Sequence, residues 1–265
     1  MYKRQHYNIF DNVAYGLKLR KMDKATIREK VLHILSLVGL EGMEERMTNQ
    51  LSGGQQQRAA FARILARGAD VLLLDEPLSS LDPHLREEMR FEIKDLQVKY
   101  GFSIIYVTHD QSEAMALSDR IIVMKRGLVD QVGSPKEVYY HPQDEFVADF
   151  IGESNFLHGT LQSVSGNSGV ALIEGQSVPV EGVNGRATGD EVTLVLRPES
   201  AHVGEVGVMP CEVTLSRFMG HYQDYQLRCG KHLVKVTEFN PKNRRSYEVG
   251  EQAFLSFAPD DVHVL

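Results

Sequence analysis

The sequence predicts an α/β domain with a parallel sheet, followed by a small all-β domain. A chain of 265 residues is long enough for about two domains. Helical periods alternate with short apolar strands as far as about residue 150, and from residue 156 onward short strands are broken by Gly, Asn, Asp and Pro. We place the boundary at residues 151–154, so that the two domains cover residues 1–152 and 153–265.

Composition excludes several classes of protein. The net charge is −7 without a cluster of like charges, so we expect no nucleic-acid partner. No apolar run approaches the roughly 18 residues that a membrane span requires, and we expect no signal peptide. Cys211 and Cys229 are too few for a disulfide framework. We expect two free thiols of a cytosolic protein, and a single disulfide remains the alternative.

Helix signals divide the first domain. Asp23 can cap a helix that ends at Gly39, and a second helix begins after Ser52 and stops at Arg67-Gly68. Apolar residues at helical spacing mark the buried face of the first of these helices: Ile27, Val31, Ile34, Leu35 and Val38.

Strands follow these helices. The apolar runs at residues 71–75, 103–108 and 120–124 predict strands of one parallel sheet, buried on both faces. A third helix lies between the first two strands, because Asp82 is a cap residue and Pro83 suits a first helical turn.

The second domain has a different sequence pattern. "EVTLVLRPE", "CEVTLSRF", "HLVKVTEF" and "EQAFLSF" are short strand patterns separated by turn residues. This spacing predicts a barrel or a sandwich.

The stretch "LSGGQQQR" suggests an anion site. Ser52 and Gln55 have the capping-box spacing, so a helix N-terminus with free N–H groups begins here. Gly53 and Gly54 lack side chains, which lets an anion approach the backbone. A helix cap without a ligand is the alternative.

Three further side chains are expected at one edge of the sheet. Asp75 and Glu76 end the first strand and His109 ends the second, where open α/β sheets bind ligands. The two carboxylates suit a metal–nucleotide site, with Asp75 for Mg²⁺ and Glu76 to orient or deprotonate a water. A solvated acidic pair and a structural histidine are the alternatives.

Together, "LSGGQQQRAAFARILA", "VLLLDEPLSSLD" and "IYVTHDQSEAMALSDRIIVM" resemble the nucleotide-binding subunit of an ABC transporter over roughly residues 6–155. The resemblance implies part of a P-loop NTPase fold with a helical subdomain, and ATP with Mg²⁺ as cofactors. It implies Asp75 as the magnesium residue, Glu76 as the catalytic base and His109 as the switch histidine. It also implies the ATP-capping signature and the D-loop: Ser52, Gly53, Gly54 and Gln55, then Ser79, Ser80, Leu81 and Asp82.

The second domain, including "VLRPESAHV", is similar to the TOBE-like, OB-like regulatory barrel of importers of the sugar, polyamine, iron and oxyanion group. The resemblance implies a subunit that couples ATP hydrolysis to uptake of a small polar solute. Its implied partners are a second ATPase subunit packed head to tail, transmembrane permease subunits and, indirectly, a solute-binding protein. Its implied location is peripheral, on the cytoplasmic side of the cell membrane.

The sequence departs from the family at its start. The 265 residues contain no G-x-x-x-x-G-K-[ST] loop, and Gln5 does not match the family's Q-loop. The family pattern begins with "NIFDNVAYGLKLRK", so we expect an N-terminally truncated ATPase domain that completes a partner's ATP site and is inactive alone. A truncated or frameshifted product, a regulatory half-subunit, and more remotely a non-transport ABC ATPase are the alternatives.

Overall fold

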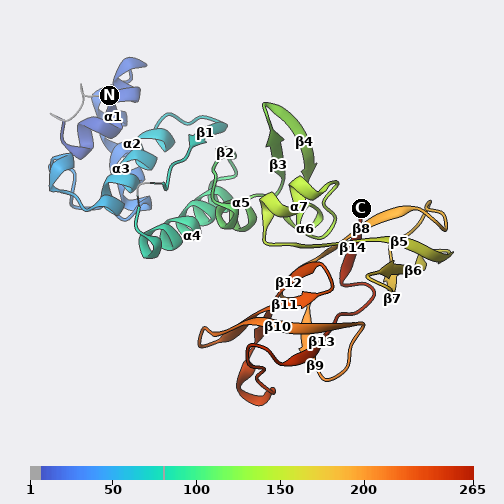
Figure 1. The fold of residues 1–265 in the computed structure, drawn as a ribbon. Helices are drawn as coiled ribbons and strands as arrows, with labels where there is room; N and C mark the ends of the chain where they lie inside the picture. The colour runs from blue at the N-terminus through green and yellow to red at the C-terminus, as the bar shows by residue number, and fades with distance from the viewer. Residues whose placement is uncertain (1–6, 80) are drawn as a thin grey trace. The chain divides into compact units, whose positions relative to one another are not determined.

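The computed structural model describes residues 7–79 and 81–265. The chain divides into two compact units, Met1–Leu117 and Ser118–Leu265, whose elements are labelled in Figure 1. Within the described ranges, no helix combines the length and the apolar character needed to cross a membrane.

The first unit begins with three helices around a shared apolar core. The predicted cap at Asp23 is confirmed, because its carboxylate accepts the Thr26 N–H at 2.9 Å. The predicted apolar stripe of this second helix is buried. The helical elements are α1 (Ile9–Leu19), α2 (Lys24–Leu37), a 3₁₀ turn (Thr48–Gln50) and α3 (Gly53–Leu65).

A two-stranded sheet follows, and its strands have the parallel pairing that the sequence predicts. Asp82 caps the intervening helix through the Leu85 N–H at 3.1 Å, and Pro83 is its first residue. The elements are β1 (Val71–Asp75), α4 (Pro83–Tyr100), β2 (Ser103–Val107) and α5 (Gln111–Leu117).

The prediction that these strands are buried on both faces is wrong. In β1 and β2, one face packs on Phe61 and α4, whereas the other exposes large apolar side chains, Leu73 by 73%. The reason is that strands alternate their side chains between two faces, and only one face is covered in this part of the chain.

The predicted third strand does not join this sheet. Residues Ile121–Lys125 form β3, which pairs antiparallel with β4 (Leu128–Gly133) in a separate hairpin. The two-residue connection Arg126-Gly127, with positive φ at both positions, favours this local pairing.

The all-β prediction for the second domain is confirmed. Two five-stranded sheets, with orders β12-β11-β10-β13-β9 and β14-β8-β5-β6-β7, share one apolar core (Figure 1). Their strands are β5 (Asn155–Ser165), β6 (Ser168–Ile173), β7 (Gln176–Glu181), β8 (Glu191–Leu196), β9 (His202–Gly204), β10 (Met209–Phe218), β11 (Tyr222–Cys229), β12 (His232–Phe239), β13 (Gln252–Ser256) and β14 (Val262–Val264). A 3₁₀ turn, Pro241–Asn243, follows β12.

The compact units divide at Leu117 and Ser118, earlier than the boundary that the sequence suggests after residue 152. Helices α6 (Pro135–Tyr140) and α7 (Glu145–Ile151) pack with the sheets because of Arg197, which follows β8. Arg197 is 4% exposed and donates to the backbone carbonyls of Tyr139, Ala148, Gly152 and Glu153. The boundary between the packed units therefore differs from the point where the sequence pattern changes. That the ATPase-type sequence ends at residue 152 stays a prediction.

The expectation of two free thiols is wrong in this structure. Cys211 on β10 and Cys229 on β11 form a disulfide with a Cα–Cα distance of 4.4 Å. The antiparallel register sets Glu212 opposite Arg228, so that the two cysteines face one another at the next pair. Both are buried in the core of the two sheets.

Candidate functional site

The start of α3 has the predicted capping box. The Ser52 Oγ accepts the Gln55 N–H at 3.3 Å, and the Gln55 Oε1 accepts the Ser52 N–H at 3.1 Å. Ser52 and Gly53 are exposed, so the positive end of this helix faces solvent. The arrangement suits an anionic ligand, and the contact with ATP remains a prediction.

The two glycines of this motif differ in their surroundings. A Cβ on Gly53 would meet only the Leu81 side chain, at 3.9 Å, whereas a Cβ on Gly54 would lie 2.8 Å from the Leu85 Cδ1. The expectation that Gly54 opens the backbone to an anion stays a prediction, and the structure adds a second reason for a glycine at this position. Its missing side chain makes room for α4.

The predicted carboxylates lie where β1 ends. Asp75 is the last residue of β1 and Glu76 follows with φ 44°, a left-handed backbone conformation that is uncommon for a residue with a side chain. The Glu76 N–H donates to the Val107 carbonyl at 2.8 Å, which ties this turn to the end of β2.

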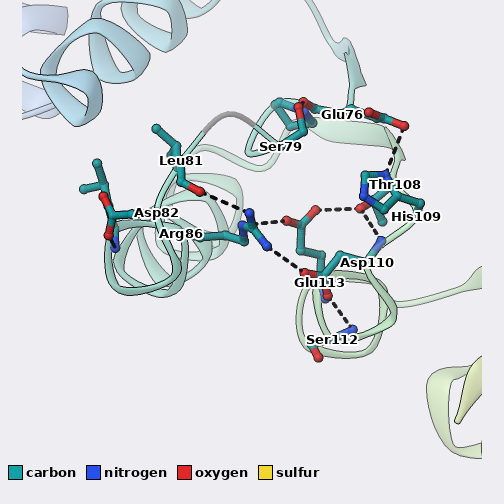
Figure 2. A network of polar contacts seen from close by, with 12 residues as sticks. Glu76, Ser79, Leu81, Asp82, Arg86, Thr108, His109, Asp110, Ser112 and Glu113 are labelled. Atoms are coloured by element: carbon teal, nitrogen blue, oxygen red, sulfur yellow. Dashed lines mark hydrogen bonds and ion pairs between the residues drawn. The ribbon is translucent and has the colours of Figure 1, made fainter.

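His109 lies beside Glu76, as the shared sheet edge predicts. The Nδ1 of His109 is 3.1 Å from the Glu76 Oε1 (Figure 2). The His109 side chain is 74% exposed and that of Glu76 is about half-exposed. This pair can therefore receive a water or a phosphate oxygen from solvent.

The D-loop segment is anchored to the same turn. The Ser79 Oγ and N–H both donate to the Glu76 carbonyl, at 3.0 and 3.3 Å. Asp82 serves as the cap of α4, and Ser80 lies outside the described residues. The Gln57 side chain of α3 donates to the Pro77 carbonyl, so the signature helix contacts this turn as well.

Sequence reasoning missed a buried network beneath His109. Glu113, the third residue of α5, is 3% exposed and accepts hydrogen bonds from the Tyr106 Oη at 2.9 Å and the Thr108 Oγ1 at 2.7 Å. Burial, with the hydrogen bond to the Glu113 carboxylate, raises the pKa of Tyr106. The signal available in the sequence was the spacing of Asp110 and Glu113, which is that of a helix cap followed by an acidic residue at the third position.

Asp110 also belongs to this network. Its carboxylate accepts the backbone N–H groups of Ser112 and Glu113, at 2.9 and 3.2 Å. Burial favours the neutral acid, but these hydrogen bonds and the charges of Arg90 and Arg86 outweigh it and lower the pKa of Asp110. Asp110 therefore stays ionised and fixes the start of α5.

The donor set at the edge of β1 fits a magnesium ion. Mg²⁺ prefers oxygen ligands and is usually held by one or two carboxylates together with waters and substrate phosphates. Asp75 and Glu76 are adjacent exposed residues, and the Asp75 carboxylate has no hydrogen-bond or ion-pair partner in the described part of the chain. Within residues 7–79 and 81–265, no group of three His, Cys, Asp or Glu side chains could hold a metal ion, so an ion at Asp75 and Glu76 would also need water or phosphate ligands.

Comparison with known proteins places these motifs in a family. The ABC transporter family model matches residues 2–79, and the TOBE domain model matches residues 194–265. The chain is 40% identical over 263 residues to the spermidine/putrescine import ATP-binding protein PotA of Acetivibrio thermocellus, a match that covers 98% of this chain and 72% of that protein.

The chain belongs to the family of ABC importer ATP-binding subunits. A second member, the PotA protein of Pseudomonas fluorescens, is 42% identical over 279 residues and matches 98% of this chain and 74% of its own length. Among solved structures, cbiO1 of Clostridium perfringens, described as part of the ABC transporter complex cbiONQ, gives a TM-score of 0.47 at 35% identity, over 50% of this chain and 53% of that one. Members of the family bind nucleotide, and the fold is that of an ABC ATPase domain followed by an all-β TOBE domain.

Proposed function

We propose that this ABC importer subunit completes an ATP site whose phosphates are held by a second ATPase subunit packed head to tail against it. The observation that carries the proposal is the exposed N-terminus of α3, where Ser52 and Gln55 form a capping box. The pair of Glu76 and His109, 3.1 Å apart at the carboxyl ends of two parallel strands, suits the handling of a water and a phosphate at one position.

Each side chain of this pair has a separate role. The Glu76 carboxylate orients the attacking water and accepts its proton, because it is about half-exposed at the sheet edge beside His109. His109 donates a hydrogen bond to the terminal phosphate. Asp75 would hold a Mg²⁺ ion, which would supply positive charge to neutralise the phosphates.

The signature and the D-loop act across the subunit interface. Ser52, Gly53 and Gln55 present the N-terminus of α3 to the terminal phosphate held by the partner. Gly54 supports them by packing closely on Leu85. The D-loop residues Ser79, Ser80, Leu81 and Asp82 contact the same partner.

The proposed solute is a polyamine. The relatives at 40–42% identity over nearly the whole chain are named as spermidine/putrescine import proteins. The subunit docks on permease subunits at the cytoplasmic side of the membrane through the segment from Phe10 to Leu19, the greater part of α1. A solute-binding protein delivers the polyamine to the permease.

A second candidate function is that of a regulatory half-subunit without ATPase activity. The observation that favours it is the sequence itself, in which the only Gly-Lys pair, Gly230-Lys231, has Tyr225 where a phosphate loop needs its first glycine. Glu76 can orient a water, but residues 1–265 contain no such loop to hold the β- and γ-phosphates beside it.

ATP hydrolysis in a mixed dimer tests the proposal. The chain is combined with an intact homologous ATPase subunit whose own signature serine is replaced, so that hydrolysis at the partner-held site depends on this chain. We expect no turnover by residues 1–265 alone and restored turnover in the mixture.

Two variants then assign the activity. Gly53→Asp places a carboxylate against the phosphate and should lower stimulated turnover at least about 100-fold, in the range that loss of one electrostatic contact produces. The matched control Ala25→Asp adds a carboxylate to the exposed first turn of α2 and should leave turnover unchanged. Undiminished turnover in Gly53→Asp would contradict the proposal, and a mixture without turnover would favour the regulatory function.

A further inference from the structure

Arg86, in the first turns of α4, connects three segments of the chain. Its Nη2 donates to the Leu81 carbonyl at 3.1 Å, and its Nη1 donates to the Asp110 Oδ2 at 3.3 Å. Its Nε lies 4.0 Å from the Glu113 Oε1 (Figure 2). A planar guanidinium can reach several acceptors in fixed directions, whereas a lysine ammonium is a single flexible point charge.

These contacts differ from those of a surface ion pair. Glu113 is only 3% exposed, and a buried carboxylate requires hydrogen bonds or a positive partner. Tyr106 and Thr108 supply the hydrogen bonds, and Arg86 supplies a positive charge. The buried Glu113 carboxylate therefore has two hydrogen-bond donors and a positive charge nearby.

The network determines the position of His109 through its two chain neighbours. Thr108 donates to Glu113 and accepts the Asp110 N–H at 2.9 Å, while the Asp110 carboxylate accepts Arg86. His109 itself is largely exposed, and its side chain contacts that of Glu76. The residues on either side, rather than packing of the imidazole, hold this ring near Glu76.

A second contact of Arg86 leads back to the backbone of Glu76. The Leu81 carbonyl, which accepts Arg86, lies two residues after Ser79. Ser79 in turn donates to the Glu76 carbonyl through both its Oγ and its N–H. The contacts form a ring from Glu76 through the D-loop, Arg86, Asp110 and His109 back to Glu76.

We infer that Arg86 is a positioning residue that couples the D-loop to the histidine segment and thereby sets His109 against Glu76. The inference rests on the proposed function for its catalytic meaning, but the coupling itself is a property of this chain alone. A chain of contacts becomes evidence of coupling only when a double-mutant cycle shows it.

Nuclear magnetic resonance of the full chain tests the coupling directly. The His109 ring signals are assigned by their loss in His109→Asn, and their displacement by Glu76→Gln is measured in different backgrounds. In Arg86→Gln this displacement should fall at least about twofold, because His109 no longer stays beside residue 76. In the matched control Lys99→Gln, which removes one positive charge from the far end of α4, it should be unchanged.

Arg86→Lys keeps the positive charge and removes the forked guanidinium. This variant also provides the test if Arg86→Gln does not fold. A lysine cannot reach the Leu81 carbonyl and the Asp110 carboxylate together, so the displacement should fall in this variant too. The same displacement as in the wild type, in a folded Arg86→Lys or Arg86→Gln chain, would overturn the inference.

A fusion that adds a homologous N-terminal segment with a phosphate loop to the full chain provides the second readout, because ATP is then held beside Glu76 and His109. Arg86→Lys should lower kcat about tenfold and leave the KM for ATP unchanged, since positioning acts on the chemical step. An unchanged kcat would also overturn the inference. If the wild-type fusion shows no turnover, the proposed roles of Glu76 and His109 fail, and the resonance measurement still decides whether Arg86 positions His109.

Discussion

Replacing Arg197 by alanine should destabilise the second unit far more than replacing an arginine on its surface. Arg197 is 4% exposed and donates to four backbone carbonyls at 2.7–3.1 Å and to the Ser154 Oγ at 2.6 Å. Its guanidinium also stacks on the Tyr139 ring at 4.0 Å. Burial lowers the pKa of Arg197, and the carbonyl oxygens around the guanidinium stabilise its charge.

The magnitude follows from those acceptors. Each buried carbonyl that loses its donor costs about 1–3 kcal/mol, and the costs add incompletely because neighbouring donors such as Ser154 can shift. We therefore expect Arg197→Ala to lower the free energy of unfolding by about 3–5 kcal/mol. Arg197→Lys should recover only part of this loss, since one ammonium cannot reach acceptors on both α6 and α7.

Hydrogen–deuterium exchange of the full chain provides the assay, because it reports opening of α7 separately from opening of the sheets. Peptides covering Glu145–Ile151 should lose protection first. The matched control is Arg228→Ala on β11, an exposed arginine whose ion pair with Glu212 is 3.7 Å long and should cost less than about 1 kcal/mol. Equal protection in the two variants would refute the argument that Arg197 joins α6 and α7 to the β-domain.

Three further predictions concern separate features. Gly54→Ala should lower the free energy of unfolding, measured by urea titration, by about 1–3 kcal/mol because the new Cβ meets Leu85. Gly53→Ala should change the urea midpoint little, and equal midpoints in the two variants would contradict the packing argument. Burial lowers the pKa of His263, so the unfolded chain binds a proton at this residue at a higher pH than the folded chain does. The free energy of unfolding should therefore fall as the pH drops below about 6.5, and it should depend less on pH in His263→Gln. The same pH dependence in both chains would count against this prediction. Cys211→Ala should cost about 2–4 kcal/mol, and a thiol assay on the unfolded, unreduced wild-type chain should detect no free thiol; two free thiols would contradict the disulfide.

Local features could be predicted from the sequence and long-range ones could not. The caps at Asp23, Ser52 and Asp82 were predictable because each cap depends on a donor three residues away. The apolar run of β1 identified a strand, but its burial depends on which element covers each face. Arg197 was missed because its acceptors lie 43 to 58 residues earlier in the chain.

The neighbouring glycines of the signature show why a motif does not assign one physical role to all its positions. Gly53 is exposed at the helix N-terminus, with room in front of it for an anion. Gly54 is buried, and a methyl group there would press into Leu85, three residues into the helix that Asp82 caps. Because a carboxylate at residue 54 would disturb α4 whether or not ATP approaches, only a change at Gly53 can test the contact with phosphate. A loss of turnover in Gly54→Asp would report packing, whereas the same loss in Gly53→Asp would report charge.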